Sequence, residues 1–273
     1  MNDFSLVLGV DGKHLEKLGL VWPTWEKNKP STIKDGKNWR PLIIFYDVDQ
    51  VKPSQIKRRI THPHPLLIPW PPRGVFYQGD ANTKWFHPQR MKMLSGFVHV
   101  AAFHVDTPYW LKLDLDVVAV GNDDWIRDEW FKKHPAIVCH RWGFTKPANQ
   151  MLQLDAWVEE NKQGMPIVAK NPPLNLVPNV GWERIQHPRI ISWCGFFCSA
   201  LTKLASALAM NTVGEGQLPV PSQDGYLWYL ATRLGLDVVR ANMKEQGWEW
   251  WSTDRNIRNS VKEVLGTVPW YHD

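Results

Sequence analysis

The chain has 273 residues, 44% of them hydrophobic and 22% charged, with a net charge of +5 and an isoelectric point near 9.0. This composition excludes a disordered chain, and the length suffices for a large domain with a substantial core. The basic balance suits an anionic partner such as a nucleotide, and it permits nucleic acid without requiring it.

Expected strands and helices alternate along the first half of the chain. The strands are short apolar runs that end at turn-forming residues, and they cover 4–10, 41–46 and 66–68. The helices cover 15–25, 53–60 and about 88–106. Pro23 is expected to interrupt the first helix, because proline lacks a backbone donor. The alternation predicts right-handed βαβ units and a mostly parallel sheet.

Residues 109–120 are the most informative segment. We interpret them as a buried strand with Asp114 and Asp116 at its exit. Side chains two residues apart share a face of an extended chain, so the two carboxylates point together, opposite to Leu113 and Leu115. A hard divalent ion that also binds phosphate oxygens would offset their repulsion. The alternative is a pair of ordinary surface acids in a solvated loop.

Acidic residues follow each expected strand that leads to this segment. They are Asp11, Asp47, Asp49, Asp114 and Asp116. Ligands of parallel α/β sheets bind beyond the carboxyl ends of the strands. We therefore expect these acids to converge on one edge of the sheet.

The second half of the chain is less regular. Strands are expected at 136–139, 190–197 and 236–240. Helices are expected near 152–161, 197–208 and 222–234. Neither an internal repeat nor a linker is present, so residues 1–273 are predicted to form a single domain.

The cysteines and the first residues bear on the compartment. Cys139, Cys194 and Cys198 cannot all pair and lack zinc-type spacing, which indicates a reducing compartment. The opening segment is too short and acidic for a signal peptide, and no uninterrupted run of 18 apolar residues exists. A soluble, cytoplasmic protein without a membrane span is expected.

The order of these elements resembles the GT-A fold of metal-dependent glycosyltransferases. Asp114-Leu-Asp116 matches their D-x-D motif, 193–197 their glycine-containing strand, 223–225 their acidic helix start and His272 their C-terminal histidine. The resemblance extends over the whole chain. It implies a single α/β domain with a mostly parallel central sheet flanked by helices. Residues 1–120 would be the nucleotide-sugar-binding half, and 121–273 the acceptor-binding half.

The resemblance also implies a reaction and its residues. A sugar would move from a nucleotide-diphosphate donor, with UDP favoured, to a hydroxyl acceptor. Mn²⁺ or Mg²⁺ would be held by Asp114, Asp116 and His272, and Asp224 would be the general base. Position 223 is Gln where many inverting members have Glu. His272 reaches the ion only if Trp270 and Tyr271 are buried and anchor the tail.

Donor-binding and acceptor-binding residues follow from the same resemblance. The donor-binding set is Val10, Asp11, Asp47, Asp49, Arg90, Lys92 and Asp114. The acceptor-binding set is Trp142, Trp193, Gly195 and Gln223. Structural alternatives stand beside these roles: a turn for Asp47 and Asp49, a helix-dipole contact for Asp224, and surface positions for Arg90 and Lys92.

Rival functions belong to other classes. A sugar-phosphate nucleotidyltransferase would normally have a Gly-rich, Arg-containing loop after the first strand, whereas this chain has Leu8-Gly-Val-Asp-Gly-Lys13. Glycosyl transfer onto DNA bases is an alternative acceptor choice. A carbohydrate-binding protein would account for the 17 tryptophans, since flat rings suit sugars, but not for the converging acids.

Overall fold

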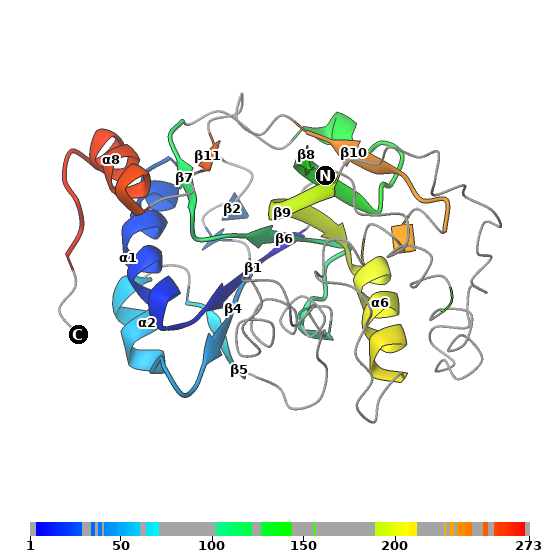
Figure 1. Ribbon diagram of the computed structural model, residues 1–273, viewed down its shortest axis with the longest axis horizontal. Coiled ribbons are helices and arrows are strands. Elements are labelled where there is room, and N and C mark those ends of the chain that lie inside the picture. The colour runs from blue at the N-terminus through cyan, green and yellow to red at the C-terminus, as the bar shows by residue number, and fades with distance from the viewer. Residues whose placement is uncertain are drawn as a thin grey trace.

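A seven-stranded mixed sheet is the centre of the molecule (Figure 1). Its strands are β1 (Phe4–Val10), β4 (Leu42–Asp47), β5 (Leu66–Trp70), β6 (Tyr109–Leu113), β8 (Ile137–Gly143), β9 (Arg189–Cys198) and β10 (Val238–Arg240). Their order is β10-β8-β9-β6-β1-β4-β5. Only β9 runs antiparallel to its neighbours, so the expected mostly parallel α/β sheet is confirmed.

Helices and two small sheets surround the main sheet. The helices are α1 (Gly12–Lys27), α2 (Pro53–Arg59), α6 (Ser199–Asn211), α8 (Asp254–Leu265) and the 3-10 turn η2 (Asp128–Phe131). The small sheets pair β7 (Val117–Ala119) with β11 (Trp248–Trp250), and β2 (Lys34–Asp35) with β3 (Asn38–Trp39). The computed structural model describes residues 4–28, 34–35, 38–39, 41–60, 64–70, 101, 103–121, 127–143, 156, 189–211, 227, 230–231, 234–241, 248–250 and 254–270. Within these ranges no helix has the length and apolar character to cross a bilayer.

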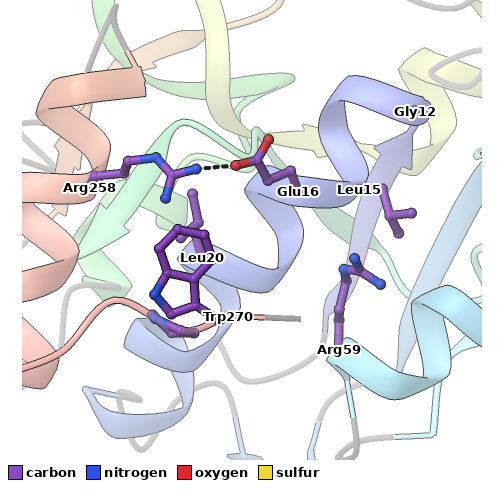
Figure 2. A pocket seen from close by; sticks show the side chains of 8 residues that line it. Gly12, Leu15, Glu16, Leu20, Arg59, Arg258 and Trp270 are labelled. Atoms are coloured by element: carbon purple, nitrogen blue, oxygen red, sulfur yellow. Dashed lines mark hydrogen bonds and ion pairs between the residues drawn. The ribbon is translucent and has the colours of Figure 1, made fainter. Parts of the chain in front are cut away.

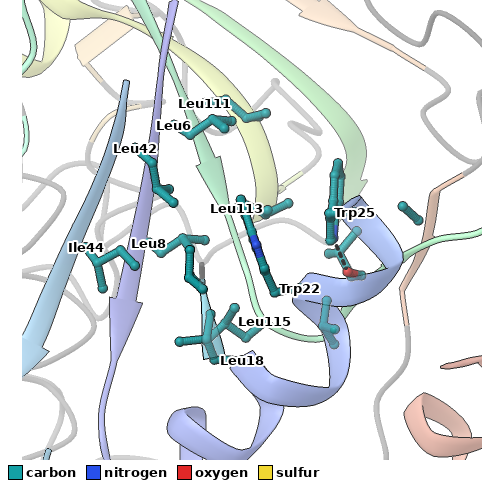
Figure 3. Close-up of a cluster of buried hydrophobic side chains, with 14 of the residues drawn as sticks. Leu6, Leu8, Leu18, Trp22, Trp25, Leu42, Ile44, Leu111, Leu113 and Leu115 are labelled. Atoms are coloured by element: carbon teal, nitrogen blue, oxygen red, sulfur yellow. Dashed lines mark hydrogen bonds between the residues drawn. The ribbon is translucent and has the colours of Figure 1, made fainter. Parts of the chain in front are cut away.

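The two faces of the sheet are covered by different helices. Alternate residues of β1 and β6, such as Leu8 and Leu113, join Trp22 and Trp25 of α1 in one buried cluster (Figure 3). Helices α2 and α8 pack beside α1 on this side (Figure 1). On the opposite face, the Trp110 indole N–H donates to the Thr202 hydroxyl of α6 at 3.2 Å. The strands are therefore apolar on both faces, as expected for a covered parallel sheet.

Helix α1 continues through Pro23, contrary to the expected interruption. A proline inside a helix costs about 3 kcal/mol, because it removes a hydrogen bond and clashes with a carbonyl. The neighbouring Trp22 and Trp25 are each only 1% exposed. Burying each of these large rings contributes more than about 1.5–3 kcal/mol, the range for a smaller apolar side chain. Packing of α1 against the sheet thus outweighs the local penalty.

The expected strand over 109–120 is wrong in its second half. Strand β6 ends at Leu113, and Val117 N–H donates to the Asp114 carbonyl at 3.2 Å across a turn. The chain then leaves the main sheet, and β7 pairs antiparallel with β11. Asp114 and Asp116 therefore lie in the turn at the strand exit, where the alternation of faces no longer applies.

Other expected boundaries agree with the structure to within a few residues. Strand β1 has the predicted bounds, and α2 and α6 begin within two residues of theirs. Most of the expected helix at 88–106, the one near 152–161 and most of the one at 222–234 lie outside the described residues.

Candidate functional site

The carboxyl ends of β6, β1 and β4 lie side by side at one edge of the sheet. These strands are adjacent and parallel, with Leu6 opposite both Leu42 of β4 and Leu111 of β6. Asp11, Asp47 and Asp114 each come at or directly after the end of one of these strands. This topology therefore places Asp11, Asp47 and Asp114 at one edge of the sheet, as the sequence predicts.

The acidic pair lies at the exit of β6 and is partly buried. The Oδ1 atom of Asp116 is buried, whereas the Asp114 side chain is 31% exposed. Lys112 Nζ lies 2.6 Å from Asp114 Oδ1, and the lysine side chain is only 5% exposed. Such a contact offsets part of the repulsion between the two carboxylates.

Asp11 caps α1. Its Oδ1 accepts the backbone N–H of His14 at 2.7 Å and lies 2.8 Å from His14 Nδ1. Burial raises the pKa of this carboxyl, but the hydrogen bonds and charge of His14, with a backbone bond from Lys13, lower it by more, so the net pKa is lowered. A donor-binding role for Asp11 would have to coexist with this capping role.

Asp47 organises the turn after β4. Its Oδ1 accepts the backbone N–H of Asp49 at 3.0 Å, and its Oδ2 accepts the Gln50 side-chain amide. Gln50 Oε1 in turn accepts the Gly12 N–H at 3.3 Å, which links this turn to the start of α1. These hydrogen bonds give Asp47 the structural role in a turn that was the alternative to donor binding. Asp49 is exposed at the same edge.

The junction of β1 and α1 has no room for a phosphate-binding loop. Only Asp11 separates the last residue of β1 from the first of α1. The first-turn N–H groups of Gly12 and His14 already donate to Gln50 and Asp11. The Gly-rich loop expected of a sugar-phosphate nucleotidyltransferase is therefore not present at this position.

Gly195 lies in the middle of the sheet, opposite Lys112 in β6 and Cys139 in β8. A Cβ atom built there would be 3.1 Å from the Val138 carbonyl oxygen. The described contacts therefore give Gly195 a packing role, and its acceptor-binding role stays a prediction.

Several predicted site residues cannot be placed. Arg90, Lys92, Gln223, Asp224 and His272 lie outside the described residues, as do the side chains of Trp142 and Trp193. Trp270, which the tail would bury if it folded over the site, is 79% exposed here, and its ring centroid lies 5.8 Å from the Arg258 guanidinium. A lid formed by the tail, with His272 as a ligand, stays a prediction, because residues 271–273 lie outside the described ranges.

A hollow of about 310 Å³ lies along the outer side of α1 (Figure 2). Arg258 and Glu16 form an ion pair on one wall, and Arg59 lies on the opposite wall. Its lining is Gly12, Leu15, Glu16, Leu20, Arg59, Arg258, Pro269 and Trp270. The predicted acids do not line it.

The acidic pair suits a hard divalent cation. Carboxylate oxygens are the ligands that Mg²⁺ and Mn²⁺ prefer, and one or two of them commonly hold Mg²⁺ together with substrate phosphates. Among the described residues, no three His, Cys, Asp or Glu side chains gather as a cation site. Asp114 and Asp116 would be a partial ligand set, which a phosphate group, or a residue beyond the described ranges, would complete.

The sequence reasoning did not identify two residues at this edge, Lys112 and Gln50. Lys112 carried only a partial signal, because it precedes Asp114 by two positions, but the same-face rule stops at Leu113, where β6 ends. Gln50 carried none, since its bond to the Gly12 N–H joins residues 38 positions apart in the chain.

Solved structures resemble this chain over nearly its whole length. Galactosyltransferase LgtC with donor and acceptor sugar analogues gives a TM-score of 0.53 at 10% identity, covering 99% of this chain and 98% of that one. Core-mannan synthase A from Aspergillus fumigatus, in its Mn/GDP form, gives 0.51 at 11% identity, covering 98% and 86%. Both are glycosyltransferases. The chain has the GT-A fold.

The GT-A fold is shown by the comparison with solved structures alone, and not by comparison of sequences. No protein-family model matches the sequence, and no curated protein sequence matches it. A synthase of 4-diphosphocytidyl-2C-methyl-D-erythritol from Anaerococcus prevotii gives a TM-score of 0.48 at 12% identity, over 97% of this chain and 99% of that one. A likeness with a TM-score below 0.5 does not bear on activity.

Proposed function

We propose that the chain is a glycosyltransferase that uses a nucleotide-diphosphate sugar, with UDP-sugars favoured, and a hydroxyl acceptor. The observation that supports this most is the position of Asp114 and Asp116. They follow β6 at the edge where β1 and β4 also end, in a chain with the GT-A fold. Ligands of α/β sheets bind at this edge.

The reaction breaks an anomeric C–O bond and releases a nucleoside diphosphate. A divalent ion held by Asp114 and Asp116, with His272 as a third ligand, would stabilise the charge on that leaving group. Asp224 would accept the proton of the acceptor hydroxyl as the new glycosidic bond forms. Mn²⁺ and Mg²⁺ both suit the oxygen ligands.

The donor and the acceptor would lie on either side of the acidic pair. Asp49, which is exposed at the end of the β4 turn, is the better candidate for a uracil imide N–H, because the Asp47 carboxylate already serves the turn. Val10 would line the donor site, and Arg90 and Lys92 would bind the diphosphate. Trp142, Trp193 and Gln223 would line the acceptor side. A glycan hydroxyl is the proposed acceptor, and no described contact favours DNA.

The metal-dependent step is tested by a donor screen. Nucleotide release should be measured with Mn²⁺ across UDP-, GDP- and dTDP-sugars, with and without a chelator. Release should require the metal, and Asp116→Asn should abolish it while the circular dichroism spectrum stays unchanged. Asp237→Asn, an exposed acid before β10, is the matched control and should keep full activity. Full activity of Asp116→Asn, or of the wild type in excess chelator, would contradict the proposal.

The general base is tested separately. Asp224→Asn should lower transfer to the acceptor by roughly 10²–10⁴-fold, the usual contribution of a general base. Donor binding, measured by calorimetry with the nucleoside diphosphate and Mn²⁺, should be unchanged. Equal losses in donor binding and in transfer would instead assign Asp224 to the donor site or to the fold.

A further inference from the structure

Lys112 is a buried lysine on the strand that leads to the acidic pair. It comes one residue before the end of β6, and its side chain is 5% exposed. Moving an ammonium group from water into such a position is costly unless the charge is paired. Asp114 supplies a paired carboxylate, with 2.6 Å between Nζ and Oδ1.

The residue opposite Lys112 in β9 is a glycine, so no side chain of that strand lies directly across from the lysine. Directly opposite residues of antiparallel strands project to the same face, and the residue opposite Lys112 in β9 is Gly195. The next pair along this face is Trp110 and Phe197, whose ring centroids are 5.0 Å apart. A glycine beside the lysine therefore adds no side chain to a face that is already crowded.

The ion pair changes the electrostatics of the candidate site. Asp114 and Asp116 carry two negative charges within one turn, and the ammonium group of Lys112 reduces that sum by one. A charge-assisted hydrogen bond also fixes the orientation of the carboxylate that accepts it. Partners of this kind orient the ligands of a metal before the ion arrives.

We infer that Lys112 is the positioning residue of the acidic pair, and that its ammonium group holds the Asp114 carboxylate in the orientation that receives a divalent cation. The inference rests on the proposed metal-dependent function. Lys112 acts through Asp114, and the step that it prepares is cation binding.

Two effects of opposite sign make the inference testable. If the ammonium group only competed with the cation for Asp114, its removal would tighten cation binding, because a repulsive charge would be lost. If it positions Asp114, its removal should weaken binding by roughly 10–100-fold, as the loss of an orienting partner does at other metal sites. The direction of the change in affinity therefore separates the two roles.

The experiment is a titration of the full chain with Mn²⁺ in the absence of nucleotide. Electron paramagnetic resonance measures the free Mn²⁺ at each step. Lys112→Met should raise the Kd for Mn²⁺ by roughly 10–100-fold, and Lys112→Arg should recover most of the affinity because it keeps a cationic donor. Lys203→Met removes an exposed lysine from α6 and should leave the Kd unchanged. If the methionine variant does not fold, Lys112→Gln serves the same comparison and should also bind Mn²⁺ more weakly.

Urea unfolding in chelator separates this role from a purely structural one. Lys112→Met should be destabilised, and the double variant Lys112→Met/Asp114→Asn should regain stability, because removing both partners leaves no uncompensated charge. A lower stability with an unchanged or a lower Kd for Mn²⁺ would overturn the positioning role while leaving the metal site intact. If the wild type binds no Mn²⁺, or Asp116→Asn binds it equally well, the proposed metal site itself is overturned and the inference with it.

Discussion

Single side chains at the strand exits serve the fold as well as the candidate site. Asp11 was expected to bind the donor, yet its carboxylate caps α1 through His14. Asp47 was expected to contact the nucleobase, yet it closes its own turn through Asp49 and Gln50. Aspartate is common at strand exits because its short carboxylate satisfies nearby backbone N–H groups. An acid at a strand exit is therefore weaker evidence for function than two acids that lie at the same exit.

The capping role of Asp11 predicts a specific dependence of stability on pH. The pKa of Asp11 in the folded chain is lower than its ordinary value of 3.8. Its charge therefore stabilises the fold above that pH, and the contribution is lost as the pH falls through the folded-state pKa. Asp11→Asn keeps a capping side chain without the charge, whereas Asp11→Ala removes both and should cost about 1 kcal/mol.

Urea unfolding across pH checks this expectation. At pH 7 the wild type should be the most stable, followed by Asp11→Asn and then Asp11→Ala. The advantage of the wild type over Asp11→Asn should shrink as the pH falls below the ordinary value of 3.8. A gap between these two proteins that does not change with pH would contradict the role of the charge.

At the scale of elements, the C-terminal half of α1 holds the segment that follows the acidic pair. Trp25 Nε1–H donates to the Val117 carbonyl at 2.9 Å, and Asn28 Nδ2–H donates to the Ala119 carbonyl at 2.8 Å. The Ala119 N–H donates to the Thr24 hydroxyl at 3.2 Å. Strand β7 is thus bonded to α1 directly after Asp116, so the turn of the acidic pair is fixed at both ends, by β6 and by α1.

Trp25→Phe should therefore affect both stability and metal binding. It leaves the buried Val117 carbonyl without its indole donor, which should cost about 1–3 kcal/mol, and it frees the end of the acidic turn. Trp22→Phe is the matched control, because Trp22 is equally buried but donates to Glu26 within the same helix. Urea unfolding should show losses for both variants, whereas Mn²⁺ titration should show weaker binding for Trp25→Phe alone. Equal Mn²⁺ affinities would indicate that α1 does not position the pair.

At the scale of the whole molecule, one sheet joins the two parts of the chain. Strands β1, β4, β5 and β6 come from the first 120 residues, and β8, β9 and β10 come from the remainder. They meet where β6 pairs with β9, and Lys112 lies opposite Gly195 at this seam. The acidic pair follows β6 directly, so it lies where the proposed donor half and the proposed acceptor half meet.

The sequence by itself determined the α/β class, the bounds of β1 and the place of the acidic pair at a strand exit. These features depend on local patterns, namely apolar runs, turn residues and the period of side-chain alternation. Tertiary structure decided what depends on distant partners. Packing of Trp22 and Trp25 carried α1 through Pro23, and pairing of β7 with β11 drew the chain out of the main sheet after Leu113. The buried contact between Lys112 and Asp114 also needed the sheet, because Lys112 lies in β6 between β1 and β9, opposite Val7 and Gly195.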